Sequence, residues 1–203
     1  MNRRSAVALL LSALLAAPAA AQAPQAAAAP APAPANPAAW TFDKAHSQVG
    51  FTIRHLVSRV RGSFRDWTGT LTIADPAKWE SAAIDVQIRT ASIFTDNERR
   101  DNHLRTSDFF LADSFPVIAF RSTRIERKGD DAKIHGMLTI RGVTKPVVLD
   151  GTFLGYSKGA QQERIGFEAS TTINRLDYGV AWNRAVEGGG MTLGDDVKID
   201  INI

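Results

Sequence analysis

The chain ends in the sequence Val197-Lys-Ile-Asp-Ile-Asn-Ile203, in which apolar and polar residues alternate without a break. This period of two places all four apolar side chains on one face of an extended strand. Such a strand would invite aggregation if it were left as an exposed sheet edge. We therefore expect it to be paired on both sides, and we favour a closed barrel over a sandwich. In that barrel, one of the two strands paired with the C-terminal strand would be the first strand, which we place at residues 40–44.

The same alternation recurs upstream. It is seen in the apolar residues Val49, Phe51 and Ile53, Leu71 and Ile73, Ile84, Val86 and Ile88, Ile134, Leu138 and Ile140, and Phe167 to Ile173. Turn signals separate these stretches, among them Asp75-Pro76, Lys128 to Asp131 and Arg141-Gly142. About eight strands with mostly short connections result. The pattern predicts an all-β, eight-stranded antiparallel barrel.

Residues 95–107 break the period of two and predict one short helix over 96–106. Thr95 and Glu98 have the spacing of a capping box at its start. Its charged residues predict a solvated face with i,i+4 pairing. A second short turn is expected near Pro76 to Trp79.

The first 39 residues differ in composition from the rest. Their only charges are Arg3 and Arg4, and all ten Phe, four Trp and two Tyr lie in residues 40–203. Those 164 residues carry 22 basic and 21 acidic side chains, which argues against a nucleic-acid-binding protein, because such a protein needs a concentrated basic face. We place the folded domain at 40–203.

Residues 1–21 read as a secretory signal peptide. A short basic start precedes an apolar run over 6–17 and a small-residue cleavage site at Ala19-Ala20-Ala21. The predicted location is the periplasm, without stable membrane insertion after cleavage. A retained anchor is the rival, but its apolar run is shorter than the ~20 residues of a span. Arg3-Arg4 leaves general and twin-arginine export both open. Residues 22–39, rich in Ala and Pro, predict a disordered linker of open function.

Motifs for catalysis and metal binding are weak. The chain has no cysteine, and His46, His55, His103 and His135 are spaced without a metal signature, so we predict no metal site. Gly155-Tyr-Ser-Lys-Gly159 matches a nucleophile elbow but lies between two predicted strands, and no histidine follows it. Asp101 with His103 is the one acid–base pair that would serve an enzyme. We predict a binding protein, not an enzyme, with no cofactor.

Several motifs, in this order and spacing, resemble the YceI-like family of bacterial polyisoprenoid-binding proteins. They are Asp43-x-x-His46-Ser47-x-Val49-x-Phe51-x-Ile53-x-His55, Gly62-x-Phe64, Thr95, Arg100-Asp101-x-His103-Leu104-x-x-x-Asp108-Phe109-Phe110, Phe115-Pro116-x-Ile118-x-Phe120, residues 138–146, Arg175-x-Asp177-Tyr178-Gly179 and Gly194-Asp195-x-Val197-x-Ile199. The match spans essentially all of residues 40–203. Tyr178 stands where a Phe is commoner in the family, and the 22–39 linker has no counterpart there.

The resemblance implies a lipocalin-like barrel that holds an apolar long-chain lipid, such as a quinone tail or a polyprenyl chain. The inward residues are then the candidate ligand contacts: Val49, Phe51, Ile53, Phe64, Leu71, Ile84, Val86, Ile88, Phe120, Leu138, Ile140, Phe167 and Ile173. Leu104, Phe109 and Phe110 are candidates for a lid. Arg100, His103 and Arg175 are candidates for contacting a head group, or else hold loops through Asp101, Asp108 or Asp177.

Two other functions stay open at this stage. One is an enzyme acting on a lipid-like substrate, and the other is a packed structural or stress-response module without ligand. The sequence also leaves open the physiological ligand, its delivery partner and the oligomeric state, a homodimer being one alternative.

Overall fold

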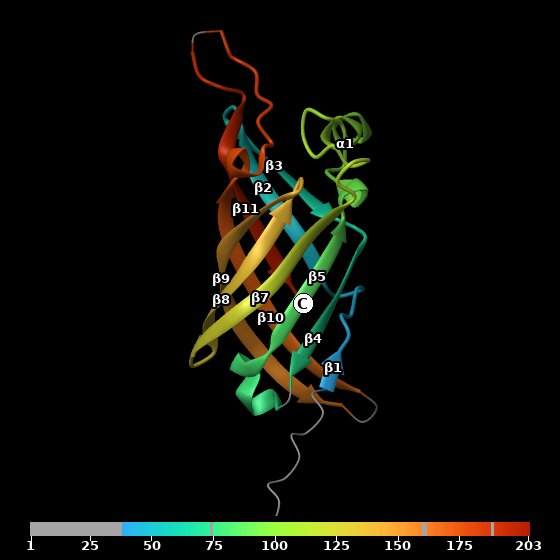
Figure 1. Cartoon of the computed structure of the whole chain (residues 1–203), viewed down its shortest axis with the longest axis vertical. Helices are drawn as coiled ribbons and strands as arrows, with labels where there is room; N and C mark the ends of the chain where they lie inside the picture. The colour runs from blue at the N-terminus through green and yellow to red at the C-terminus, as the bar shows by residue number, and fades with distance from the viewer. Residues whose placement is uncertain (1–37, 74, 160–161, 188) are drawn as a thin grey trace, which may run out of the picture. The chain divides into compact units, whose positions relative to one another are not determined.

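The computed structural model describes residues 38–73, 75–159, 162–187 and 189–203 (Figure 1). The predicted signal peptide and the predicted linker up to residue 37 lie outside these ranges. The strands are β1 (Ala38–Trp40), β2 (Gln48–His55), β3 (Ser58–Phe64), β4 (Trp67–Ile73), β5 (Ala83–Arg89), β6 (Ile93–Phe94), β7 (Val117–Lys128), β8 (Asp131–Ile140), β9 (Val143–Lys158), β10 (Glu163–Asn174) and β11 (Leu193–Asn202). The helices are η1 (Pro76–Ser81), η2 (Thr90–Ser92), α1 (Glu98–Arg105) and η3 (Arg175–Tyr178).

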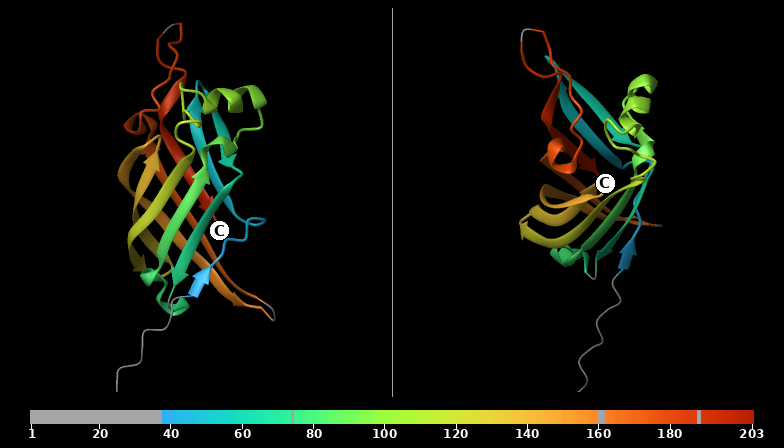
Figure 2. Two further views of the ribbon diagram at one scale, coloured as in Figure 1. Left: turned by 45° about the vertical axis from the view of Figure 1, so that its right-hand side comes forward. Right: turned by 45° about the horizontal axis from the view of Figure 1, so that its top comes forward.

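All strands join one antiparallel sheet in the order β1-β4-β5-β7-β8-β9-β10-β11-β2-β3-β6, and Figure 2 shows how strongly it curls. The all-β antiparallel prediction is confirmed, but the count of eight is wrong, because the described residues form eleven strands. Two of the eleven, β1 and β6, are only three and two residues long. The turn between β2 and β3 consists of Leu56 and Val57, so no glycine, asparagine or proline marks it in the sequence.

The predicted closure of the barrel is also wrong. β11 pairs with β10 on one side and with β2 on the other, with Val197 opposite Ile53 and Ile199 opposite Phe51. Residues 40–44 do not form a strand beside it, because Trp40 ends β1, which pairs with β4. Asp43 then begins a turn, in which His46 donates its backbone N–H to the Asp43 carbonyl at 3.1 Å. Within the described residues, the hydrogen-bonded order therefore ends at β1 and β6.

Alternation does set the two faces of the sheet. Val49 and Leu138 are buried on the inner face, whereas Arg54 and Lys133 are exposed on the outer face.

Side chains on the inner face pack closely against the backbone at Gly62. A Cβ on Gly62 would lie 2.4 Å from Cζ of Phe51, across the β2–β3 pair. Glycine at position 62 thus makes room for an aromatic ring on the inner face.

The helix lies where it is expected, but its cap differs from the prediction. Asn97, not Thr95, caps α1, since the Asn97 side-chain oxygen accepts the backbone N–H of Arg100 at 2.9 Å. The turn expected near Pro76 is the helix η1, which begins with a proline after the capping residue Asp75. No helix in the described part of the chain is long and apolar enough to cross a membrane.

A candidate ligand-binding cavity

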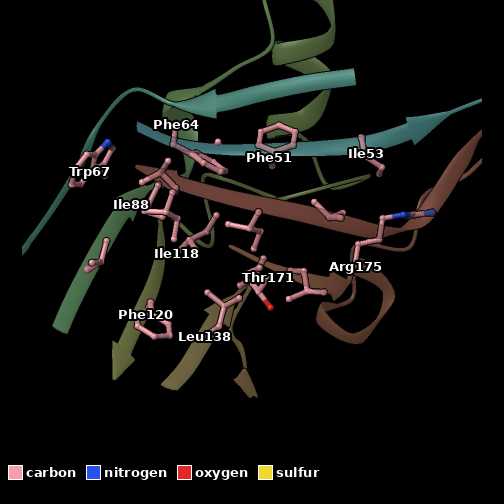
Figure 3. Close-up of a pocket in the computed structure, with 18 of the residues that line it drawn as sticks. Phe51, Ile53, Phe64, Trp67, Ile88, Ile118, Phe120, Leu138, Thr171 and Arg175 are labelled. Carbon is pink, nitrogen blue, oxygen red and sulfur yellow. The ribbon is translucent and has the colours of Figure 1, made fainter. Parts of the chain in front are cut away.

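The curled sheet encloses a cavity of about 670 Å³. All the long strands contribute lining residues, and α1, η1, η3 and the loop after η3 contribute others. Figure 3 shows side chains from β2, including Phe51 and Ile53, facing residues of the opposite wall such as Phe120 and Leu138. The volume falls within the range of about 300–1,000 Å³ that is usual for small-molecule sites. An interior of this kind suits an apolar ligand.

The structure places every residue that we nominated as a ligand contact or lid on the wall of this cavity. These are Val49, Phe51, Ile53, Phe64, Leu71, Ile84, Val86, Ile88, Leu104, Phe109, Phe110, Phe120, Leu138, Ile140, Phe167 and Ile173. Contact between any of them and a ligand stays a prediction.

Other lining residues escaped the sequence analysis, for two reasons. Val197, Ile199, Ile201 and Ile203 line the cavity from the end of the chain. Their alternation was evident, so the same signal could have found them. A second group comprises aromatic residues outside the strands, namely Phe42, Trp79, Tyr178 and Trp182, whereas Trp67 begins β4 on the same face as Leu71. No alternation predicts where a side chain points in a loop or a single turn of helix.

Aromatic rings connect the cavity wall to the segment after α1. The Phe64 ring lies 5.9 Å from that of Phe51 and 6.1 Å from that of Phe110, measured between centroids. The ring of Phe109 lies 5.2 Å from that of Trp182 and is buried. The segment that we expected to form a lid is therefore packed against the wall at this end.

A polar network joins α1 to the end of β6. Asp101 is buried and accepts hydrogen bonds from the backbone N–H of Thr95 at 2.9 Å and from its hydroxyl at 2.5 Å. Arg100 donates to the Thr95 hydroxyl and carbonyl oxygens at 2.7 and 2.6 Å. The predicted solvated face is thus wrong for Asp101, because its carboxylate satisfies the donors of a buried threonine.

His103 forms a separate pair. Its Nε2 lies 2.7 Å from an oxygen of Asp108, and its ring meets those of Phe109 and Trp182 edge-on, at 5.0 and 5.1 Å. Asp101 and His103 have different partners, so they do not form the acid–base pair that the sequence suggested. His103 and Arg100 both line the cavity.

Arg175 has most of its donors occupied by the protein. It donates to the carbonyls of Gly194, Val180 and Trp182 at 2.6–2.9 Å, and to Asp195 at 3.3 Å. The pairing with Asp177 that we considered is wrong, since Asp195 takes that place. Burial lowers the pKa of the guanidinium, and the nearby Asp195 carboxylate acts in the opposite direction. Arg175 therefore holds the loop after η3 against the start of β11.

Exposed residues mark where the cavity meets solvent. Asn97 and Arg99, at the start of α1, line the cavity and are exposed. Half-buried His55 and Val60 line it from the β2–β3 hairpin. Figures 1 and 2 place α1 and the β2–β3 turn at the same end of the molecule. We take this end as the mouth.

Comparisons with known proteins show which family has this fold. The model of the YceI-like domain matches residues 40–203. The chain belongs to the YceI-like family. Among its relatives, the UPF0312 protein SAS2572 of Staphylococcus aureus is 40% identical over 164 residues, covering 79% of this chain and 93% of that protein.

Two solved structures show how far the similarity extends. A YceI protein of Campylobacter jejuni is 38% identical with a TM-score of 0.66, over 81% of this chain and 95% of that one. A polyisoprenoid binding domain from Saccharophagus degradans is 15% identical with a TM-score of 0.56, over 82% and 96% of the two chains. The second likeness is one of fold alone.

Proposed function

We propose that the protein binds the apolar chain of an isoprenoid-type lipid, such as a quinone tail or a polyprenyl chain, inside this cavity, and carries it in the periplasm. The observation that carries the proposal is an interior of about 670 Å³ lined mainly by aliphatic and aromatic side chains. Membership of the YceI-like family supports it, as does the described binding of polyisoprenoid by the Saccharophagus domain.

Burial of hydrocarbon provides enough free energy for such a function. Each buried methylene-sized group contributes about 0.8 kcal/mol, so a five-carbon isoprene unit contributes about 3–4 kcal/mol before ordering losses. Several units suffice for tight binding without a charged anchor. Apolar walls also discriminate weakly between similar chains, by about 1–3 kcal/mol per methylene. We therefore expect selection by length and shape.

A polar head group would lie at the end near α1. Arg100 and His103 line that end, and part of each side chain is accessible to solvent. Each is already held by the protein, Arg100 on Thr95 and His103 on Asp108. The remaining N–H groups of Arg100 would donate to an oxygen of the head group without leaving Thr95, and Nδ1 of a neutral His103 ring would accept a hydrogen bond from a head-group hydroxyl. Arg175 acts instead as a positioning residue for the loop.

Two alternatives are less well supported. A packed module would lack an interior of this size. An enzyme of the kind that the sequence suggested would pair Asp101 with His103, but these two residues have different partners, Thr95 and Asp108. We infer a binding protein whose residues 1–21 direct export. Sequencing the N-terminus of exported protein should begin near Gln22, and a membrane-bound chain that starts at Met1 would contradict this part.

The test is extraction and mass spectrometry of lipid from the purified protein. Ala169 lies on the inner wall, so Ala169→Phe should narrow the cavity and lower the lipid content severalfold. Ala119 alternates with the inward residues Ile118 and Phe120, so Ala119→Phe on the outer face is the matched control. Wild type and control should carry the same prenyl-chain lipid. A wild-type extract with no lipid above the blank would contradict the proposal.

A further inference from the structure

The turn between β2 and β3 exposes an apolar tip. Val57 is fully exposed and Leu56 is 41% exposed. Leu56 has a φ of 51°, a conformation that leucine rarely adopts, and its carbonyl accepts a hydrogen bond from Nη1 of Arg54 at 3.1 Å. A turn that combines positive φ with solvent exposure normally uses glycine or asparagine. This turn instead holds two large apolar side chains out of the fold.

A second exposed apolar residue lies beside this tip. The backbone N–H of Leu56 donates to the Thr192 carbonyl at 2.8 Å, and Met191, which precedes Thr192, is 54% exposed. Thr192 and His55 both line the cavity. The backbone hydrogen bond between Leu56 and Thr192 therefore joins the apolar tip to a residue of the cavity wall, and the tip lies beside the mouth.

Arginines stand directly behind the tip on the outer face. Arg54 and Arg59 are opposite each other in the β2–β3 pair, and Arg61 follows two residues further along the same face. All three are exposed, and in the described part of the chain no salt bridge involves any of them. Like charges placed opposite one another are unfavourable in a free hairpin. An anionic partner would relieve this repulsion.

We propose that this hairpin-tip surface, formed by Leu56, Val57 and Met191 with Arg54, Arg59 and Arg61, docks on a bilayer that contains anionic lipid. The inference rests on the proposed function, because a carrier of membrane lipid has to reach its ligand. Docked in this way, the mouth of the cavity faces the bilayer.

The spacing along the strands fits the layers of a membrane. Strands rise about 3.3 Å per residue, so Arg54 and Arg59 lie about 7 Å behind the tip. Apolar side chains of surface-bound proteins enter about 5–10 Å into the boundary between head groups and acyl chains. With Leu56 and Val57 at that depth, the two arginines lie at the level of the phosphates, to which guanidinium groups donate pairs of hydrogen bonds.

Not every residue at this end favours an anionic surface. Glu187 lies in the same hairpin as Met191, and Asp195 and Asp196 lie near the start of β11. The Asp195 carboxylate forms an ion pair with the Arg175 guanidinium. We therefore expect the apolar tip to supply much of the affinity, and the arginines to supply the preference for anionic lipid.

The test is sedimentation of the full chain with vesicles of phosphatidylcholine, with and without phosphatidylglycerol. Val57→Asp should lower partition to both kinds of vesicle about tenfold or more, because the gain from burying a valine is lost. Leu154→Asp is the matched control, since Leu154 is 59% exposed on β9, towards the opposite end of the sheet, and the charge change is the same. The control should bind as wild type.

A second pair of variants tests the charge. Arg59→Gln with Arg61→Gln should lower binding to the anionic vesicles about fivefold for each arginine and should leave the neutral vesicles nearly unchanged. Lys128→Gln with Lys158→Gln removes two exposed charges at the opposite end and should have no such effect. All variants share residues 1–37, so any contribution of that segment is common to them. Circular dichroism should show that each variant is folded.

Lipid content, measured by mass spectrometry on the same samples, separates the two proposals. Wild-type protein that carries lipid but does not bind either kind of vesicle would overturn docking. That result would indicate delivery by a protein partner and would leave the proposed function intact. Equal losses in Val57→Asp and Leu154→Asp would also overturn docking. Tip-dependent vesicle binding by protein that carries no lipid would support docking and overturn the proposed function.

Discussion

At the scale of single residues, two buried charged side chains organise the end of the cavity near the mouth. Asp101 and Arg175 are each 4% exposed. Each satisfies backbone groups that have no strand partner, Asp101 at the end of β6 and Arg175 in the loop after η3. A buried charge is stable only when hydrogen bonds replace the water it loses. Both residues therefore shape the cavity by fixing the loops around it.

Replacing Arg175 tests this role. Arg175→Met keeps much of the volume but leaves the carbonyls of Val180, Trp182 and Gly194 without their donor, so the free energy of unfolding should fall by about 3–5 kcal/mol. Arg121→Met is the control, because the Arg121–Asp85 pair is exposed and should be worth about 1 kcal/mol or less. Urea denaturation measures both. Similar losses in the two variants would show that Arg175 is not a structural clamp.

Phe51 distinguishes cavity wall from solid core. Phe51→Ala in a solid core should cost about 3–5 kcal/mol, but a bound lipid would partly fill the gap. The lipid-loaded variant should therefore lose less stability, relative to wild type, than the delipidated one. Ile73, which is fully buried and does not line the cavity, provides the control. Ile73→Ala should lose the same amount in both forms, as thermal unfolding would show. Equal losses for Phe51→Ala in both forms would place Phe51 in ordinary core.

At the scale of elements, β11 connects the two walls of the cavity. It pairs along its length with β10 and with β2, and its inward residues line the interior. By contrast, β1 is three residues long and pairs only with β4, at an end of the sheet. A central strand contributes hydrogen bonds on both sides and apolar area on one face, so its loss cannot be repaired locally.

Deleting residues 197–203 should therefore prevent stable folding. The deletion separates β10 from β2 and removes Val197, Ile199, Ile201 and Ile203 from the interior. Deleting residues 1–40 removes β1 and should leave a cooperative thermal transition. A C-terminal truncation that melts at the wild-type temperature would contradict the central role of β11.

At the scale of the whole molecule, stability and binding are coupled through the open interior. A fold that encloses about 670 Å³ forgoes the packing contacts of a solid core, and a ligand that fills this space supplies them. Any ligand that binds only the folded state raises its stability. Lipid removal should accordingly lower the melting temperature.

A series of lipids with one head group and increasing numbers of isoprene units tests the size of the cavity. Each added unit should tighten the dissociation constant at least tenfold while it is buried, because about 3–4 kcal/mol is gained before ordering losses. Affinity should then reach a plateau once the cavity is full. Displacement of a fluorescent lipid measures the constants. Affinity that does not depend on chain length would exclude the cavity as the binding site.

Local sequence determined the strand faces. Backbone geometry directs successive side chains of a strand to opposite sides, so alternation alone places residues such as Phe51, Ile88 and Leu138 on the inner face. The short helix was equally visible, because residues 96–106 lack a period of two. These features depend on neighbours in sequence, and the structure keeps them.

Pairing and loop contacts were decided only by the tertiary structure. The second partner of β11 is β2, whose paired residues lie about 140–150 positions away in the chain. The carbonyls held by Arg175 and the ring positions of Trp79 in η1 and Trp182 in a loop likewise depend on segments outside the strands, where no alternation relates sequence to direction. Local patterns specify which way a strand side chain points. Only the balance of packing and hydrogen bonding over the whole chain specifies which residues that side chain contacts.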